Sequence, residues 1–146
     1  MTFAAAIRAF EEKALLRANQ SITEAATFIA KENVKATQNI NLGGYSNGDM
    51  ANNWHISYGA LTVPVPNGPD LSGSASFARI DSLAKSMDFY RKDGVVYITN
   101  AMPYSYRVNF LGFPTEQSTN GWHWTGKIGA YGFVGQSINN LKGKYL

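Results

Sequence analysis

Two histidines are the first residues to consider for chemistry, because an imidazole can bind a metal ion or transfer a proton near neutral pH. His55 and His123 are the only histidines in the 146 residues, and the sequence has no cysteine. Neither histidine stands at a metal-binding spacing from another ligand, whereas a zinc site needs at least three protein ligands that converge. We therefore expect two ordinary polar residues beside tryptophans, with no metal site and no cofactor.

The carboxylates and glycines offer no recognisable catalytic motif. Asp81 and Asp88 could face each other, but such residues are more often solvated, and glycoside hydrolysis needs a facing pair that nothing here singles out. No Gly-x-Ser-x-Gly elbow marks a nucleophilic serine. The glycines at 43–44 and from 126 to 135 lack the spacing of a phosphate-binding loop. We expect no catalytic residues, and we expect that the chain is not an enzyme.

The aromatic segment Trp122–His123–Trp124 could form a platform on which a sugar ring stacks. Aromatic side chains are also enriched where subunits meet, and a core or subunit contact is the more typical role of such a triplet. A sugar- or peptide-binding module that uses Tyr90, Trp122 and Trp124 therefore stays open as an alternative of a different functional class.

The composition favours a protein whose surface is partly covered by partners. Charged residues make up 16% of the sequence and hydrophobic residues 45%, whereas soluble domains average about 25% charged residues. The net charge of +3 is mild, and the closest basic pairs are Arg91–Lys92 and Lys142/Lys144. Proteins that read DNA usually cluster their basic residues, so we expect no sequence-specific DNA binding. A small nucleic-acid-associated protein is a third alternative, and it predicts an affinity that falls steeply with salt.

The first residues, from Met1 to Arg8, lack the basic and then apolar pattern of a signal peptide. No apolar run approaches the roughly 20 residues that span a bilayer. We therefore expect a soluble protein that is made in the cytoplasm and has no membrane partner.

Residues 3–38 have the pattern of one long amphipathic helix. At 1.5 Å per residue such a helix is about 50 Å long, whereas a compact domain of this size is roughly 30 Å across. Part of the helix must therefore project, bend or lie against another chain. The apolar residues recur at spacings of three and four, which places them on one stripe: Phe3, Ile7, Phe10, Ala14, Ala18, Ile22, Ala25 and Ile29.

The remaining sequence predicts a small sheet with further short helices. We expect a half-buried strand from Trp54 to about Ala60 and a helix at 74–87. A hairpin of strands 88–90 and 95–99 should follow, around the turn 91–94. The chain should end with a loop at 112–121 and a final helix or glycine loop at 124–141. The predicted fold class is α+β: a long N-terminal helix packed on a small, mainly antiparallel β-sheet with further short helices. We expect a single domain over residues 1–146, with the sheet and short helices at about 53–142.

A short aromatic helix is predicted directly after the second strand. Asn100 can cap it by accepting from a free N–H in the first turn, and Pro103 suits an early helical position. Tyr104, Tyr106 and Phe110 then give this helix more aromatic surface than one side can bury. Such a segment favours a surface used in assembly over a catalytic loop.

Two segments together resemble a known family. Residues 46–54, SNGDMANNW, are similar to the D-T-G-x-x-x-x-N-W segment of neck and tail-completion proteins of long-tailed bacteriophages, and residues 97–105, YITNAMPYS, to that family's Y-I-x-N-x-x-P-Y-A segment. Asn47 departs from the usual Asp-Thr pair, and Asn109–Gly112 lacks the family's glutamate before a glycine. The matching motif positions are Gly48, Asn53, Trp54, Asn100, Pro103 and Tyr104.

The resemblance implies a small α+β subunit that assembles, commonly as a hexameric ring, between the capsid connector and the tail tube. Its partners would be further copies of itself, the head-closure or connector protein, and the tail-terminator or tail-tube protein. DNA would pass nearby without sequence-specific binding, and no catalysis is implied. The protein would lie in the neck or tail of the virion after assembly in the host cytoplasm. A tail-terminator ring is the alternative within the same particle.

Rings use heterologous interfaces, in which two different patches of the subunit meet. We expect the long helix to supply one patch and the aromatic segment after Asn100 the other. The candidate interface residues are Ile7, Phe10, Tyr104, Tyr106, Phe110, Trp122 and Trp124.

Overall fold

The computed structural model describes residues 2–38, 48–87, 94–111, 116–118, 121–123 and 132–145. It has the predicted α+β fold, with a long N-terminal helix, small antiparallel sheets and further short helices. In chain order the elements are α1 (Phe3–Gln38), η1 (Ala51–Asn53), β1 (Trp54–Tyr58), α2 (Ser74–Ser86), β2 (Val96–Asn100), η2 (Arg107–Leu111), β3 (Glu116–Ser118), β4 (Gly121–His123) and α3 (Gly132–Tyr145).

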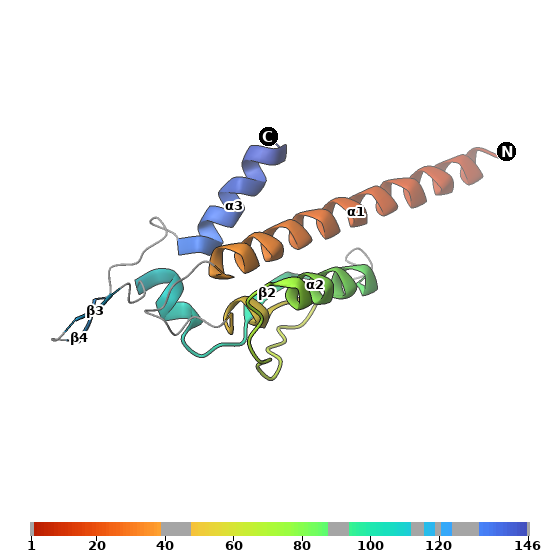
Figure 1. Cartoon of the computed structure of the whole chain (residues 1–146). Coiled ribbons are helices and arrows are strands. Elements are labelled where there is room, and N and C mark those ends of the chain that lie inside the picture. Colours follow the sequence, from red (N-terminus) through yellow and green to blue (C-terminus); the bar gives the residue numbers. More distant parts are fainter. Residues whose placement is uncertain are drawn as a thin grey trace.

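Helix α1 is the longest element, and only its second half packs on the rest of the chain. It has 36 residues, which makes it about 54 Å long. Figure 1 shows α2 and β2 on one side of this second half and α3 on the other, while the N-terminal half extends past both. Every described side chain from Thr2 to Arg17 is exposed. The predicted helix at 3–38 and its projection are thus confirmed.

The side of α1 that enters the core differs from the predicted stripe. Its buried residues are spaced by three and four, and they include two polar side chains: Ala26, Ala30, Asn33, Val34 and Thr37. By contrast, Ile22 on the predicted stripe is exposed. Hydrogen bonds partly satisfy these polar side chains, because Asn33 Oδ1 accepts from the Ser137 hydroxyl at 2.6 Å and Thr37 accepts from an indole N–H at 3.0 Å. Among the described residues, the buried Asn33 Nδ2 has no acceptor.

Strands β1 and β2 form an antiparallel pair across a long connection that contains α2. Trp54 lies opposite Asn100, and Ile56 opposite Ile98. The strand predicted from Trp54 is confirmed but ends at Tyr58, before Gly59, whose φ is +76°. Its predicted alternation is only partly found, because Ser57 is buried and Tyr58 is half-buried. The second strand is also confirmed, one residue later than expected. Its predicted partner at 88–90 and the turn 91–93 lie outside the described residues.

The core forms where α1, β1, α2 and α3 meet. Phe133, Ile56, Ile80 and Val34 are fully buried. The ring of Trp54 meets the ring of Phe133 edge to face, with ring centroids 5.9 Å apart and an angle of 90° between the rings. This contact joins the first strand to the last helix, although their residues are far apart in the sequence.

Two predictions for the C-terminal third need correction. The expected loop at 112–121 contains β3, which pairs antiparallel with β4. The aromatic helix after Asn100 begins later than expected, at Ser105, and it continues as the π-helix η2 over Arg107–Leu111. The final helical pattern is confirmed over 132–141 and continues to Tyr145, while residues 124–131 lie outside the described part.

Among the residues that the structure describes, no helix is long and apolar enough to cross a bilayer.

Candidate interaction surfaces

The motif residues converge at the point where the chain enters β1, and there they hold the fold together. Gly48 has a φ of +84°, and a Cβ at this position would collide with the backbone of Asp70 and Leu71. Glycine is therefore required for two reasons, because L side chains rarely adopt this φ and because another segment passes directly over it. The motif glycine lets the connection to α2 pack on the residues before η1.

Asn53 ties that connection down with both ends of its side-chain amide. Its Nδ2 donates to the carbonyls of Asp49 at 2.6 Å and Asn67 at 3.1 Å, and its Oδ1 accepts from the Asn67 N–H at 2.7 Å. The residue is almost fully buried. A buried amide with three such bonds is a structural element, and it fixes the loop before α2 against the start of β1.

Asn100 has the same kind of role at the end of β2. Its Nδ2 donates to the Met50 carbonyl at 2.8 Å, and its Oδ1 accepts from the Met102 N–H at 3.0 Å. The expected bond from the side-chain oxygen to a backbone N–H is present, but Met102 precedes the helix, so Asn100 closes a turn and does not cap a helix. Pro103 is exposed and lies in the next turn, in which the Ser105 N–H donates to the Met102 carbonyl at 3.0 Å, so it precedes the helix and its expected helical position was wrong.

Tyr104 is half-buried and packs against the core. Burial raises the pKa of its hydroxyl, and the charge of Asp49 raises it further. Tyr104 is therefore mainly a packing residue, and the exposed aromatic surface after Asn100 belongs to the two rings that follow it.

A capping network at the start of α2 escaped sequence reasoning. The Asp70 carboxylate accepts from the N–H groups of Gly73, Ala75 and Ser76 and from the Ser72 hydroxyl, at 2.8–3.2 Å. Burial alone would raise the pKa of this carboxyl, but the four donors outweigh it and the pKa lies below its usual value. The signal was available in sequence as an aspartate shortly before a predicted helix.

Arg79 extends this network to the motif segment. Its guanidinium donates to the Asn52 side-chain oxygen at 3.0 Å and to the Asn52 carbonyl. It also lies near His55, whose pKa is lowered, first by burial and then by the charge of Arg79. Within the described residues, no group of three or more His, Asp or Glu side chains is placed to hold a metal ion.

Four of the predicted interface residues lie on two separate exposed surfaces. On α1, Phe10 is 73% exposed and Ile7 43%. On the segment at η2, Tyr106 is 67% and Phe110 51% exposed, and their ring centroids are 4.8 Å apart. The side chain of Trp122 and all of Trp124 lie outside the described structure, as do Tyr90 and the side chain of His123.

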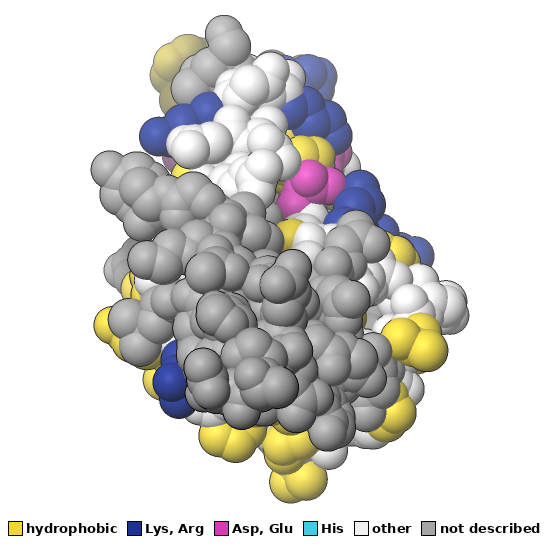
Figure 2. Space-filling model, turned by 60° about the vertical axis from the view of Figure 1, so that its left-hand side comes forward, with side chains coloured by type: hydrophobic (Ala, Val, Ile, Leu, Met, Phe, Trp, Pro, Cys, Tyr) yellow, Lys and Arg dark blue, Asp and Glu magenta, His cyan; other side chains and the backbone are white. Residues whose placement is uncertain are grey.

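Exposed apolar side chains also occur in the connection between β1 and α2. They are Leu61, Val63, Val65 and Leu71. In the view of Figure 2, hydrophobic side chains lie along the lower and right-hand edges of the molecule, while Lys and Arg side chains follow its upper right-hand side with acidic ones beside them. The exposed apolar groups are thus distributed over more than one element.

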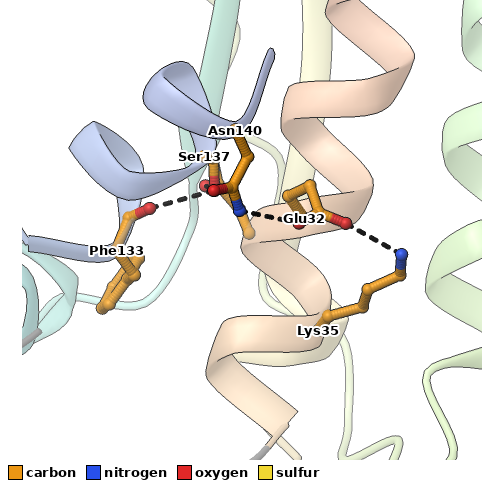
Figure 3. Close-up of polar contacts among 6 residues, drawn as sticks. Glu32, Lys35, Phe133, Ser137 and Asn140 are labelled. Atoms are coloured by element: carbon orange, nitrogen blue, oxygen red, sulfur yellow. Dashed lines mark hydrogen bonds and ion pairs between the residues drawn. The ribbon is translucent and has the colours of Figure 1, made fainter. Parts of the chain in front are cut away.

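Helix α3 is fastened to α1 by polar contacts as well as by Phe133. Figure 3 shows Asn140 of α3 donating to Glu32 at 3.1 Å, while Glu32 also pairs with Lys35 at 2.8 Å. Deeper in the contact, the Ser137 hydroxyl reaches Asn33. The end of α3 is therefore held at a fixed place beside α1, where the two helices form the walls of a groove.

No family model, curated protein or solved structure matches this chain.

Proposed function

We propose that this chain is a structural protein of the neck of a long-tailed bacteriophage. Its copies form a ring. In the family that the sequence resembles, this ring is commonly a hexamer. The ring completes the tail, joins it to the head and leaves a channel for DNA. The phage assignment is supported by the segments 46–54 and 97–105, and the assembly role by the exposed apolar residues of α1.

The observation that carries the assembly role is the uncovered first half of α1. Phe3 is 83% exposed and Phe10 73%, and Ile7 lies between them on the same side of the helix. Burial of apolar surface contributes roughly 25 cal/mol per Å². A neighbour that covers these side chains would therefore stabilise the assembly relative to the separate chains. A helix that projects from its own domain is suited to reach such a neighbour.

A second uncovered surface lies at the other end of the molecule. In Figure 1 the segment at η2, in cyan, and the N-terminus of α1 are at opposite ends. Tyr106 and Phe110 are exposed there. In the proposal this pair contacts the proteins next along the particle axis, which are the head-closure or connector protein and the tail-terminator or tail-tube protein. The proposal includes no catalysis, no membrane and no sequence-specific contact with DNA.

The test is to locate the chain in purified virions by particle imaging. Density for the chain in a ring between the connector and the tail tube would support the proposal. Density directly on the tail tube, with a separate protein joining it to the head, would support the tail-terminator alternative. A particle that lacks the chain would overturn both.

A further inference from the structure

A groove between α1 and the last turns of α3 is wide enough to take an aromatic ring. It has a volume of about 350 Å³ and is lined by Ser21, Glu24, Ala25, Leu141, Lys142 and Tyr145. A cavity of roughly 150 Å³ already holds a benzene molecule. Tyr145 is itself 52% exposed, so the groove presents an apolar wall to solvent.

The side of α1 that forms this groove also carries the exposed phenylalanines. Eleven residues make slightly more than three full helical turns, so Phe3, Ala14 and Ala25 lie nearly on one line along the helix. Phe10 lies beside this line, 15 residues before Ala25, which is about 22 Å along the axis. Because α1 is one continuous helix, the ring of Phe10 cannot reach the groove of its own chain, so a Phe10 ring that enters this groove must belong to another copy.

The charges beside Phe10 and beside the groove are complementary. Glu11 follows Phe10 by about 100° around the helix, and Lys13 lies about 60° to the other side. The groove likewise has one charge of each sign, Lys142 on α3 and Glu24 on α1. All four charged side chains are exposed. A second copy of the chain therefore offers a ring of suitable size with one charge of each sign beside it, and each of these charges has an opposite charge at the groove.

We infer that the Phe10 ring of one copy inserts into the α1–α3 groove of the next copy, with Glu11 facing Lys142 and Lys13 facing Glu24. This inference rests on the proposed ring function and names its subunit contact. The contact joins two different patches, as a ring requires. It also replaces the pairing expected from sequence, in which the long helix met the aromatic segment after Asn100, and so leaves Tyr106 and Phe110 for other proteins.

Disulfide trapping tests the contact directly, because the natural chain has no cysteine. The variants Lys13→Cys and Glu24→Cys are purified separately, mixed and mildly oxidised. Each variant has one cysteine, so any disulfide must join two copies. It forms readily only where the two Cα atoms come within about 7 Å. We expect a disulfide dimer from the mixture and much less from either variant alone.

A mixture of Lys13→Cys with Ser82→Cys provides the matched control, since Ser82 is also exposed but lies on α2, away from the groove. An equal yield in this control, or in Lys13→Cys alone, would overturn the inference. So would a chain that sediments as a monomer at every concentration and gives no link. Neither result decides the neck location, which particle imaging tests independently.

Charge reversal tests which charged residues face each other across the proposed contact. Sedimentation measures the dissociation constant for self-association of each variant. Glu11→Lys and Lys142→Glu should each weaken association by about tenfold, because like charges then face each other. The two changes combined in one chain should restore it. Phe10→Ala should weaken association at least as much, with an unchanged circular dichroism spectrum because the ring is exposed. Additive losses in the combined variant would contradict the proposed register.

Discussion

The indole N–H of Trp54 donates to the Thr37 hydroxyl across 3.0 Å, while that hydroxyl donates its own proton to the Asn33 carbonyl at 2.7 Å. The hydroxyl therefore acts as donor and acceptor at once in a buried place. Trp54 also packs edge to face on Phe133. Trp54 thus links α1, β1 and α3, which is a structural role.

The variant Thr37→Val should lower the free energy of unfolding by about 1–3 kcal/mol, because it leaves the buried indole N–H without an acceptor. Valine has nearly the same shape, so packing is kept. Thr23→Val is the matched control. The Thr23 hydroxyl also donates to a carbonyl four residues earlier, at 2.8 Å, but among the described residues it accepts no hydrogen bond from a tryptophan. Denaturant unfolding measures both. Equal losses would show that the indole contact contributes nothing.

Gly48→Ala should be more destabilising than Gly59→Ala. Both glycines have positive φ, +84° and +76°, and each alanine should lose about 1–2 kcal/mol from the backbone conformation alone. A Cβ at Gly59 meets no atom within 4 Å, whereas one at Gly48 meets the backbone of Asp70. The free energy of unfolding lost by Gly48→Ala, minus that lost by Gly59→Ala, measures the cost of the collision with Asp70. A difference of zero would contradict this close approach.

The backbone elements followed well from the sequence because their patterns are local. The period-two run after Trp54 and the three-four spacing from Phe3 onward depend only on neighbouring residues. The hairpin of β3 and β4 was not predicted from the sequence, which indicated a loop over these residues.

The buried side of α1 could not be predicted in the same way. Apolar spacing pointed to Ile22 and Ala25, but the core instead receives Asn33 and Thr37. Their partners, Ser137 and Trp54, are distant in the sequence, so nothing local indicated that Asn33 Oδ1 and the Thr37 hydroxyl would find hydrogen-bond donors inside. The same reason hid the role of Gly48, whose constraint comes from the Asp70 segment.

Acid should weaken the fold through Asp70. The pKa of the Asp70 carboxyl is lower in the folded chain than in the unfolded chain. The carboxylate therefore stabilises the fold above the unfolded-state pKa of about 4, and this contribution is lost as the pH falls through the folded-state pKa. Asp70→Asn should therefore be less stable than the natural chain at neutral pH, and the difference should shrink at low pH. Ser72→Ala keeps the carboxylate but removes one donor at 2.8 Å, and it should show a smaller pH dependence. A constant difference across this range would contradict the assignment.

Hydrogen exchange should divide α1 into two parts. Its first half has no tertiary cover and depends on alanine-rich helix propensity and on Thr2, whose hydroxyl accepts from the Ala5 N–H at 3.3 Å. Isolated helices of fewer than about 12–15 residues are marginal in water, so in the monomer the amides of residues 6–17 should exchange much faster than those of 26–37. In the assembled form the first half should become protected, and Phe10→Ala should remove that protection while leaving residues 26–37 unchanged. Equal protection of both halves in the monomer would mean that the projecting half is stable without a neighbour.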